Sequence, residues 1–486
     1  MGSVIAKYKS TTESNFKLSP SLHRKSISAN SNTKLVAEFL SRGLERRDLG
    51  KEVGSLNYVK NSNYYFIRTK ALQSNTYLPE ISNESVVNIH PKSFLQYNLK
   101  ENDILISKDS NIGEVIILDR DYPNYMPAGA LYRLPINKNK YYLLAFLKNY
   151  FFRNQLDILV PKGATIRHAG TRFLNCKIPI PNNNTQNVIN YVESFMRLII
   201  DLEKAIKIKF STIENLIVDE LYQSNPKSTK FAFNQPNILE LINYTRLDTG
   251  IYSKDFKEID HIIKNYKNGY HLIDSKKLKS GKTPIIRHIG NDPTLKYRWV
   301  TPTNCSDIGY LNIDERINML ETNNLSQNSM LLVNRTSRGG KGEYVGIAAY
   351  YDISVYGPGQ YNQGIYRVFN YSDEELIFKT CFMNTNIMRK YCSYMCVGSK
   401  MKEMKANQFL TIPFPNFDEN KIDEIRNLYN APFSYKNPEE ALKNSKIYII
   451  QAGLMQLEQT LRDSQQKLND ILSLIIDDLE VDIPLY

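Results

Sequence analysis

The sequence predicts a mixed α/β protein in which two similar globular domains are separated by an antiparallel pair of long coiled-coil helices. Two observations lead to this fold class: a pair of heptad-patterned stretches, and a matching series of short strands ahead of each. At 486 residues the chain is too long for one core, which favours at least two domains. We therefore expect the parts between the two helices to match one another.

The two heptad-patterned stretches, 192–220 and 447–475, are copies of one another. In the first, apolar residues recur at steps of three and four, at Val192, Phe195, Ile199, Leu202, Ile206, Ile213 and Leu216. An offset of 255 residues carries the positions from Phe195 onward to Ile450, Leu454, Leu457, Leu461, Leu468 and Ile471. The polar interruption also recurs, because Lys209 maps to Ser464. This pattern is typical of helices that pack along one seam, so we expect the two stretches to lie against each other.

The segment ahead of each heptad stretch repeats one order of elements. In the first copy we expect strands at 65–68, 104–107 and 115–118, a helix at 141–152 and a double-proline exit at 177–182. In the second copy the counterparts are 284–287, 330–333, 344–347, 377–389 and 411–416. Proline cannot donate to a central ladder, so each exit is expected at a sheet edge.

The second copy also carries an insertion. Its exit is offset by 234 residues and its helix by 255, which leaves about 21 extra residues between them. We expect a short helix at 421–428, and a second helix start at Asn437-Pro438, where a capping residue precedes proline and two acids. The predicted order is a first domain at 1–182, a helix at 183–226, a second domain at 227–416, and the insertion with the second helix at 417–486.

The composition of the chain limits the classes of function that it can have. The formal net charge is +12 and the pI is about 9.1, which favours a polyanionic partner such as nucleic acid. Five cysteines form no even framework, so a reducing compartment is expected. No run of about 18 apolar residues and no signal-peptide core is present, so we expect no membrane association.

A glycine-rich turn at 334–342 is the strongest local signal for ligand binding. It carries Arg335, Thr336, Ser337, Arg338 and Lys341, and arginine can hold a guanine edge or a phosphate at two points. It is not a Walker loop, because Lys341 is followed by glycine. The counterpart in the first copy holds Lys108, Ser110 and Asn111, of which Asn111 could pair with adenine. The alternative for both segments is a solvated hairpin tip or Asx turn.

A second basic cluster follows the predicted helix of each copy. In the first copy it contains Lys162, Thr165, Arg167, His168 and Arg172, and in the second Lys400 and Lys402. We expect mostly phosphate contacts, and a solvated charged face is the alternative. Cys381, Cys392 and Cys396 lack a fourth ligand at metal-binding spacing, so buried thiols are expected and no metal site is assigned. We find no histidine-based triad and no methyltransferase or nuclease motif, so no catalytic residue is assigned.

With this order in hand, the chain resembles the specificity (S) subunit of type I restriction-modification systems. The resemblance rests on the duplicated strands, hairpins, basic clusters, double-proline exits and heptad helices, and no single motif carries it. It implies that each globular domain is a target recognition domain for one half of a split double-stranded DNA site. It also implies a bacterial, cytoplasmic, non-catalytic subunit of an antiviral defence system.

The same resemblance implies partners. Two methyltransferase (M) subunits would dock on the helices, and restriction/translocase (R) subunits would join them, using S-adenosylmethionine, ATP and Mg²⁺ that this chain does not itself bind. The partner-binding residues we predict are Phe195, Ile199, Leu202, Ile206, Leu454, Leu457, Leu461 and Leu468. The diverged second basic cluster and the insertion depart from the expected symmetry. Two alternatives stay open: a coiled-coil scaffold that binds only protein, and a DNA-modifying enzyme with an unrecognised site.

Overall fold

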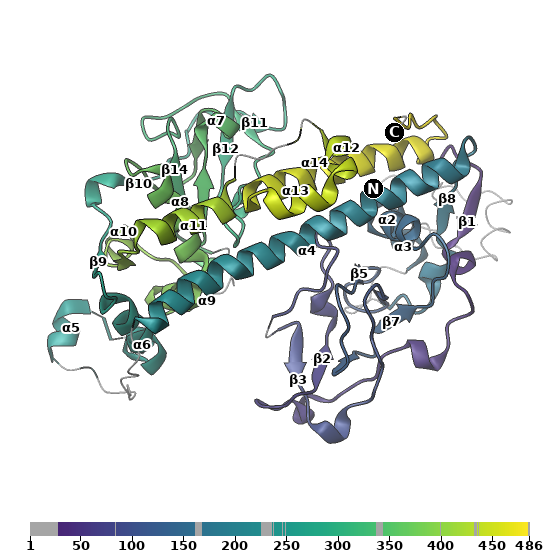
Figure 1. The fold of residues 1–486 in the computed structure, drawn as a ribbon, viewed down its shortest axis with the longest axis horizontal. Helices are drawn as coiled ribbons and strands as arrows, with labels where there is room; N and C mark the ends of the chain where they lie inside the picture. Colours follow the sequence, from purple (N-terminus) through teal and green to yellow (C-terminus); the bar gives the residue numbers. More distant parts are fainter. Residues whose placement is uncertain are drawn as a thin grey trace. The chain divides into compact units, whose positions relative to one another are not determined.

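The computed structural model describes residues 28–82, 84–160, 168–224, 236, 238–244, 246–247, 249–336, 344–398, 400–431, 435 and 437–484 (Figure 1). The chain forms two compact units of mixed α/β structure. Unit 1 comprises Met1–Ala205, Tyr435–Ile450 and Leu457–Tyr486, and unit 2 comprises Ile206–Ser434 and Gln451–Gln456. The predicted fold class is confirmed, with the C-terminal helices shared between the units rather than forming a separate region.

Unit 1 contains two three-stranded sheets and a short two-stranded ladder. The first sheet has the order β5-β4-β7 and the second β3-β2-β6, while β1 pairs antiparallel with β8. Within the second sheet β2 runs parallel to β6, and the other pairs are antiparallel. The strands are β1 (Thr33–Leu35), β2 (Tyr65–Ile67), β3 (Val86–Asn88), β4 (Ile104–Ser107), β5 (Val115–Ile117), β6 (Tyr125–Pro127), β7 (Leu131–Leu134) and β8 (Lys177–Pro179).

Unit 2 repeats this topology with one added strand in each sheet. Its sheets have the orders β10-β17-β14-β15 and β11-β13-β12-β16, and β9 pairs with β18. The strand β12 runs parallel to β16, as β2 does to β6. The strands are β9 (Tyr270–His271), β10 (Leu278–Ser280), β11 (Ile289–Gly290), β12 (Tyr297–Val300), β13 (Arg316–Ile317), β14 (Ser329–Val333), β15 (Ala348–Tyr351), β16 (Gly359–Tyr361), β17 (Ile365–Val368) and β18 (Phe414–Pro415).

The paired strands identify which residues are equivalent in the two units and correct two predictions, of which the first is the strand expected at 344–347, because β15 instead spans Ala348–Tyr351. The β2 counterpart is β12, because Phe66 pairs with Met126 and Trp299 pairs with Gln360, an offset of 233 to 234 residues. The predicted counterpart 284–287 is wrong: it forms no strand, and Ile285 is 91% exposed. Residues 284–286 are apolar like those of β2. However, strand pairing, and not composition, shows which strands of the two units are equivalent.

Each unit covers its main sheet with two consecutive helices where one was predicted. In unit 1, α2 (Lys140–Lys148) and α3 (Tyr150–Leu159) meet at Asn149, whose side chain accepts a hydrogen bond from the Phe151 amide and starts the second helix. In unit 2, α8 (Asp373–Asn384) and α9 (Asn386–Met395) meet at Thr385, which caps α9 in the same way. A capping residue inside an apolar run therefore ends one helix and starts the next.

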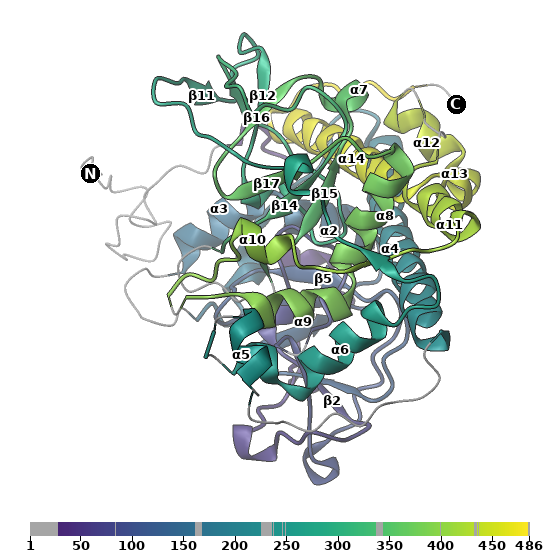
Figure 2. The same cartoon turned by 90° about the vertical axis from the view of Figure 1, so that its left-hand side faces the viewer.

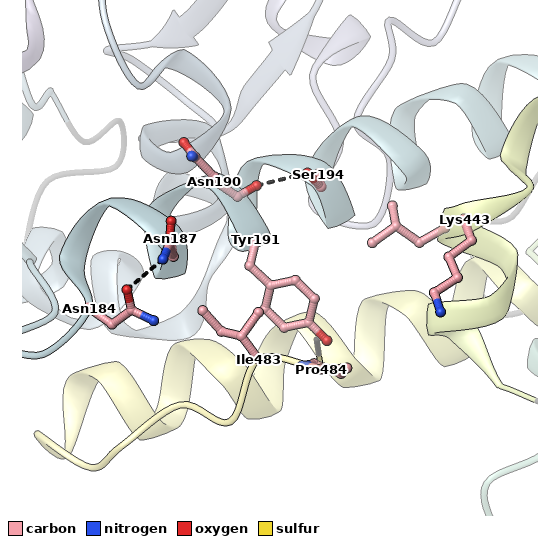
Figure 3. Close-up of a pocket in the computed structure, with 9 residues that line it drawn as sticks. Asn184, Asn187, Asn190, Tyr191, Ser194, Lys443, Ile483 and Pro484 are labelled. Atoms are coloured by element: carbon pink, nitrogen blue, oxygen red, sulfur yellow. Dashed lines mark hydrogen bonds between the residues drawn. The ribbon is translucent and has the colours of Figure 1, made fainter. Parts of the chain in front are cut away.

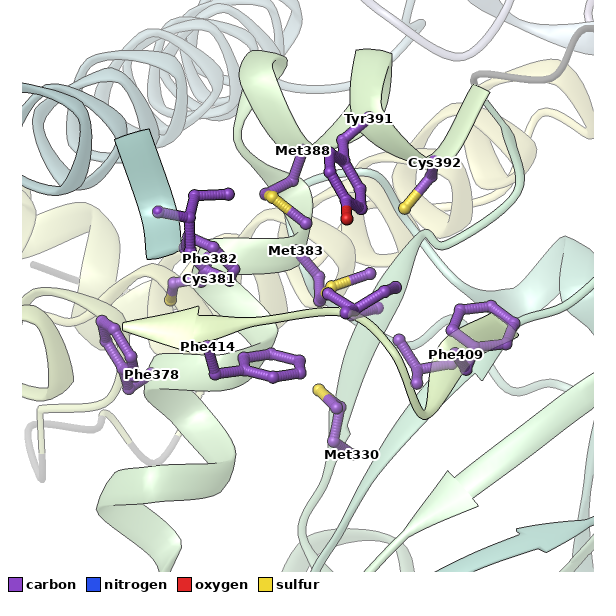
Figure 4. Packing of buried hydrophobic residues seen from close by; sticks show 14 of the residues in the cluster. Met330, Phe378, Cys381, Phe382, Met383, Met388, Tyr391, Cys392, Phe409 and Phe414 are labelled. Atoms are coloured by element: carbon purple, nitrogen blue, oxygen red, sulfur yellow. The ribbon is translucent and has the colours of Figure 1, made fainter. Parts of the chain in front are cut away.

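A large hydrophobic core lies in unit 2 between these helices and the sheet. Side chains of α8 and α9 meet Met330 of β14, together with Phe409 and Phe414 (Figure 4). Figure 2 shows α8 beside β14 and β15. The remaining described α-helices are α5 (Ile238–Tyr244), α6 (Lys254–Lys264), α7 (Ile353–Tyr356), α10 (Ala406–Phe409), α11 (Glu419–Tyr429), α12 (Pro438–Lys443) and α13 (Ser445–Gln451), besides the long α4 (Thr185–Gln223) and α14 (Leu454–Ile476).

The long helices α4 and α14 run antiparallel. At one end, the Asn182 side chain just before α4 donates to Asp478 just after α14, at 2.6 Å. Further along, Lys209 of α4 donates to the Ala452 carbonyl just before α14, also at 2.6 Å. Each contact lies within one unit, and the order of the contacts along the two helices is antiparallel. The predicted pairing of the two helices is confirmed.

The prediction of one continuous helix over 447–475 is wrong. Lys467 of α14 forms an ion pair with Glu439 of α12 at 2.8 Å, and Thr460 of α14 hydrogen-bonds to Tyr448 of α13. In one straight helix, residues 28 apart would be separated by about 42 Å. The chain therefore reverses at Ala452–Gly453, and α12 and α13 fold back along α14, as Figures 1 and 2 both show. Ile450, predicted to lie in the seam, is accordingly 77% exposed.

The entry segment of each unit holds the end of a long helix. In unit 1, the Asn30 side chain donates to the carbonyls of Ile180 and Ile475, at 3.0 and 2.9 Å. In unit 2, Lys267 forms ion pairs with Glu220 of α4 and with Asp418, at 2.9 and 3.3 Å. Residues 220 and 475 are 255 apart, the same offset as the heptad seam. The duplication thus includes the attachment of each helix end.

The inserted residues form a helix that covers unit 2. Of the insertion, α11 matches the predicted short helix, and its Ile425 and Tyr429 enter the core against α8. In unit 1 the equivalent helix α2 is instead held by α4, because Glu193 accepts from the amides of Tyr141 and Tyr142. In unit 2 the inserted helix α11 therefore packs on α8, in the place where α4 contacts α2 in unit 1.

Candidate nucleic-acid interface

The turn after β4 in unit 1 is fixed from two sides by backbone hydrogen bonds. The Lys108 amide donates to the Ala130 carbonyl, and the Lys108 carbonyl accepts from the Ala169 amide, both at 2.8 Å. Asp109 and His168 then form an antiparallel bridge. The two basic clusters predicted for the first copy, around Lys108 and around His168, therefore lie side by side.

Unit 2 fixes the equivalent turn with equivalent bonds. The Asn334 amide donates to the Gly364 carbonyl at 2.9 Å, and the Asn334 carbonyl accepts from the Met404 amide at 2.8 Å. Arg335 bridges Glu403, as Asp109 bridges His168. The segment after α9 thus meets the turn after β14, and the clusters predicted around Arg335 and around Lys402 are joined as in unit 1.

The far side of each turn rests on the second sheet-covering helix. Gly113 and Gly346 both have positive φ, 74° and 81°, and their amides donate back to Ser107 and Val333 at 2.8 and 2.7 Å. A Cβ on Gly113 would lie 2.4 Å from Leu156 Cδ2, and one on Gly346 would lie 2.5 Å from Cys392 Sγ. Only glycine combines this backbone conformation with so close an approach.

An arginine from the same helix braces each turn. Arg153 donates to the Ile112 carbonyl, and its equivalent Arg389 donates to the Val345 carbonyl, the latter at 3.3 Å. Arg153 also forms an ion pair with Glu114 at 2.6 Å. Each turn is therefore held at its base by backbone bonds, glycine packing and a guanidinium. A rigid base lets the tip present side chains with little loss of conformational entropy on binding.

The surface of the unit 1 turn is polar and mixed in charge. Asp109 is largely buried and holds both Lys108, at 2.6 Å, and the exposed His168, at 2.7 Å. Ser110, with φ of 62°, and Asn111 are exposed at the tip. Arg172 is exposed and donates to the His168 carbonyl at 3.3 Å. The turn therefore offers hydroxyl, amide, imidazole and guanidinium groups to a ligand.

Asp109 is a site residue that the sequence analysis missed. Its carboxylate orients His168 through Nδ1, which leaves the other ring nitrogen for a ligand. An acid inside a basic turn was the available signal, and it could be interpreted only once the fold had brought His168 beside it. Lys162, Thr165 and Arg167 lie outside the described residues.

In unit 2, the structure assigns different roles to the predicted residues. Arg335 is half-buried, and Lys400 is exposed. Thr336 is buried: its amide donates to the Lys402 carbonyl at 2.9 Å, and its Oγ1 accepts from the Lys402 amide at 3.1 Å. Thr336 as a ligand-contacting residue is therefore corrected to a residue that joins two segments. Ser337, Arg338 and Lys341 lie outside the described residues.

The eight seam residues predicted to bind partners are buried inside the chain. Their exposed fractions do not exceed 8%, for Phe195, Ile199, Leu202, Ile206, Leu454, Leu457, Leu461 and Leu468. The prediction that they contact a partner directly is corrected, because these side chains are already packed within the protein. A partner that docks on the helices would have to contact their outward faces.

The described residues offer little for small-molecule or metal chemistry. No group of three metal-ligating side chains occurs among them, and none of their helices is long and apolar enough to cross a membrane. A hollow of about 680 Å³ lies between the start of α4 and the C-terminal segment, lined by Tyr191, Lys443, Ile483 and several asparagines (Figure 3). Its lining holds no carboxylate, histidine or cysteine, so we assign no catalytic role to it.

The five cysteines provide a direct test of this packing. All five are buried, and burial raises the pKa of Cys176, Cys305, Cys392 and Cys396 to about 12 and raises that of Cys381 as well. Because thiolates are the reactive form, we expect no reaction with a thiol reagent at pH 8 in the native protein, and five reacting thiols after unfolding. Rapid reaction of any native thiol would show that its surroundings are more open than described.

A model of a known protein family matches the part of the chain that contains the first of these turns. Residues 50–210 match the family model described as the type I restriction modification DNA specificity domain. The resemblance to type I specificity subunits is confirmed over this segment. The matched segment contains the unit 1 turn with Lys108 and Asp109, His168 and Arg172, and about the first two thirds of α4.

Three solved structures align with most of the chain at low sequence identity and low TM-score. They are the S subunit of a type I restriction-modification system from M. genitalium (13% identity, TM-score 0.42, covering 93% of this chain and 96% of that one), a chain from a study of assembly of the type I R-M system (10%, 0.29, 92% and 98%), and the HsdS subunit from Thermoanaerobacter tengcongensis (9%, 0.24, 86% and 91%). No protein with a curated description matches this chain.

Proposed function

We propose that this chain is a sequence-specific DNA-binding subunit that reads a bipartite double-stranded site and directs the methyltransferase and restriction subunits of a type I restriction-modification complex. The observation that carries the proposal is the duplicated turn, fixed by the same backbone bonds at Lys108 and at Asn334. The specificity-domain match over residues 50–210 supports this role for the first copy. The equivalent bonds extend it to the second.

Each turn would enter a groove of the DNA duplex, with its exposed polar groups facing the base edges. In unit 2, Arg335 suits the paired acceptors of guanine, and Lys400 suits a phosphate. In unit 1, Asn111 suits adenine, while His168 and Arg172 suit phosphates or acceptor edges. The net charge of +12 supports a polyanionic ligand. The different side chains at equivalent positions favour two different half-sites.

The partners and their cofactors follow from the same proposal. Two methyltransferase subunits would dock on the outward faces of the helices, and restriction subunits would join through them, in the bacterial cytoplasm. S-adenosylmethionine, ATP and Mg²⁺ would be used by those partners, and we assign none of them to residues of this chain. The subunit itself would be non-catalytic and would determine where its partners act.

Footprinting of the assembled complex tests the proposal. We expect two protected segments separated by unread base pairs, with an affinity that falls steeply as salt rises. One continuous protected segment would contradict the proposal that each unit recognises a separate half-site. Retention of partner subunits without any salt-dependent DNA binding would instead favour a protein-only scaffold. Methylation or cleavage by the isolated chain would favour an enzyme.

Arg335 provides a residue-level test. Replacing Arg335 with alanine is expected to weaken binding by about 1–3 kcal/mol and to relax base preference in one half-site only. Arg172→Ala is expected to weaken the other half-site, and Lys276→Ala, an exposed change elsewhere in unit 2, should alter neither. Binding to randomised half-sites measures all three. An unchanged base-preference profile for Arg335→Ala would show that this turn does not contact the bases of the target.

A further inference from the structure

Two adjacent aliphatic side chains of unit 2 are almost fully exposed. Ile285 is 91% exposed and Ile286 is 83% exposed, whereas Pro284 just before them is buried. Single exposed aliphatic residues are common on protein surfaces, but two neighbours in one loop leave a contiguous apolar patch in water. We call residues 281–287 the apolar loop, and Ile285 with Ile286 the isoleucine pair.

The start of the apolar loop is fixed against the segment that follows β16. The Gly281 amide donates to the Ile365 carbonyl at 3.0 Å, and a Cβ on Gly281 would lie 2.0 Å from the Asn362 carbonyl oxygen. Only glycine permits so close an approach of two backbone segments. In the same segment, the Gly364 carbonyl accepts from the Asn334 amide at 2.9 Å. Neighbouring carbonyls therefore hold the apolar loop and the turn after β14.

Side-chain bonds hold the rest of the apolar loop. Thr283 Oγ1 donates to Gln363 Oε1, and the Gln363 carbonyl accepts from Asn334 Nδ2 at 2.9 Å. One residue thus links the loop to the turn after β14. On the far side of the isoleucine pair, the Arg287 guanidinium donates to the Pro284 carbonyl at 2.9 Å and closes the loop around the pair. The pair is therefore presented on a closed loop beside the turn for which we propose DNA contacts.

Unit 1 repeats the attachment of this loop but not its isoleucine pair. The Gly50 amide donates to the Leu131 carbonyl at 2.9 Å, and this acceptor lies 234 residues before its counterpart in unit 2. When the two glycines are aligned, the isoleucine pair corresponds to Gly54 and Ser55, which the exposed Leu56 follows. The attachment is common to both units and the pair is particular to one, as expected for residues that contact a target.

The charges around the isoleucine pair favour a nucleic-acid duplex as its occupant. Arg287 and His288 directly follow the pair and are exposed, and Lys282 precedes it in an ion pair with Glu321 at 2.9 Å. A groove of duplex DNA offers apolar base surfaces between two rows of phosphates. Aliphatic side chains next to cations match this arrangement, and the same duplex would already contact the neighbouring turn.

We propose that the isoleucine pair is a wedge that enters DNA at a base step beside the half-site recognised by unit 2 and partly unstacks that step. The inference rests on the proposed function, since the occupant is the same duplex. Burial of the aliphatic side chains offsets the cost of unstacking. Because this cost depends on the base step, flexible steps such as TA and CA should bind best here. The wedge thus adds sequence preference through DNA deformability, without a hydrogen bond to a base.

Fluorescence of 2-aminopurine tests the wedge in the assembled complex. The base analogue replaces adenine at successive positions across both half-sites and the base pairs next to them. We expect a rise in fluorescence on binding that is lost in Ile285→Ser with Ile286→Ser, together with a roughly tenfold weaker affinity of that variant. Ile285→Leu with Ile286→Leu should keep the rise, because leucine also acts as a wedge side chain.

Val355→Ser is the matched control. Val355 is a 54% exposed aliphatic residue of α7, and the amide of Ile353 in that helix donates to Asn328, just before β14. It therefore lies at the opposite end of β14 from Asn334. The control should leave affinity and fluorescence unchanged. All of these variants should unfold at the wild-type denaturant concentration, because only exposed side chains change.

The possible outcomes separate the wedge from the proposed function. DNA binding without a fluorescence rise, or a rise that persists in the serine variant, would overturn the wedge and leave the proposed function intact. Weaker affinity of the serine variant only on targets with thymine would show a methyl-group contact, and release of partner subunits would show a protein-binding surface; both would overturn the wedge. Absence of salt-dependent DNA binding by the wild-type complex would overturn the proposed function and the wedge together.

Discussion

Gly346→Ala is expected to lower the free energy of unfolding by about 2–5 kcal/mol. Part of this loss comes from placing a side chain at φ of 81°, roughly 1–2 kcal/mol, and part from overlap with Cys392 Sγ at 2.5 Å, roughly 1–3 kcal/mol. Denaturant unfolding of the variant and the wild type measures the difference. The equivalent Gly113→Ala should behave similarly, because its Cβ would meet Leu156.

Two other glycines in unit 2 separate the two causes. Gly357 has φ of 70° and ψ of −172° with open space around its Cβ position, so Gly357→Ala should show only the backbone cost, about 1–3 kcal/mol. Gly290 has neither a positive φ nor a near neighbour, and its change should stay within about 0.5 kcal/mol. Equal losses for Gly346 and Gly357 would show that the helix α9 yields to the added methyl group.

Asn30→Ala should lower the free energy of unfolding by about 2–4 kcal/mol, because each buried bond that is lost leaves an unpaired group. The Asn30 side chain is 3% exposed, donates to Ile180 and Ile475, and accepts from the Asn32 amide at 2.8 Å. Beyond the global loss, we expect faster amide exchange at the end of α14, since this side chain ties that end to unit 1. Hydrogen exchange of residues 470–478 measures it.

Asn182→Ala is the matched control. Asn182 contacts Asp478 at the same end of α14, but both side chains are exposed, so the change should cost no more than about 0.5 kcal/mol. If Asn30→Ala and Asn182→Ala have equal small effects, the entry segment does not hold the helix end. If Asn30→Ala strongly lowers stability but leaves amide exchange at the end of α14 unchanged, Asn30 stabilises another part of unit 1.

The sequence by itself determined the duplication, the mixed α/β class and the antiparallel helices. The period and the offset can be recognised in the sequence because buried seam positions from Ile199 to Ile213 and from Leu454 to Leu468 must stay apolar at helical spacing. Turn residues could also be predicted, since the polar segments after β4 and β14 and the cap at Asn437 depend on local chemistry. The candidate turns at Lys108 and Arg335 came from this local information.

Only the tertiary structure decided which segments meet. Ile285 and Ile286 have the composition of a strand but stay exposed, because no strand within the described part of the chain pairs with them. The helix over 447–475 has the right period but reverses at Gly453, where a backbone segment from the insertion occupies the path. The joining of Asp109 to His168 and of Thr336 to Lys402 depends on residues 59 and 66 positions apart. Such contacts are fixed by packing and strand pairing over long separations, which local periodicity does not encode.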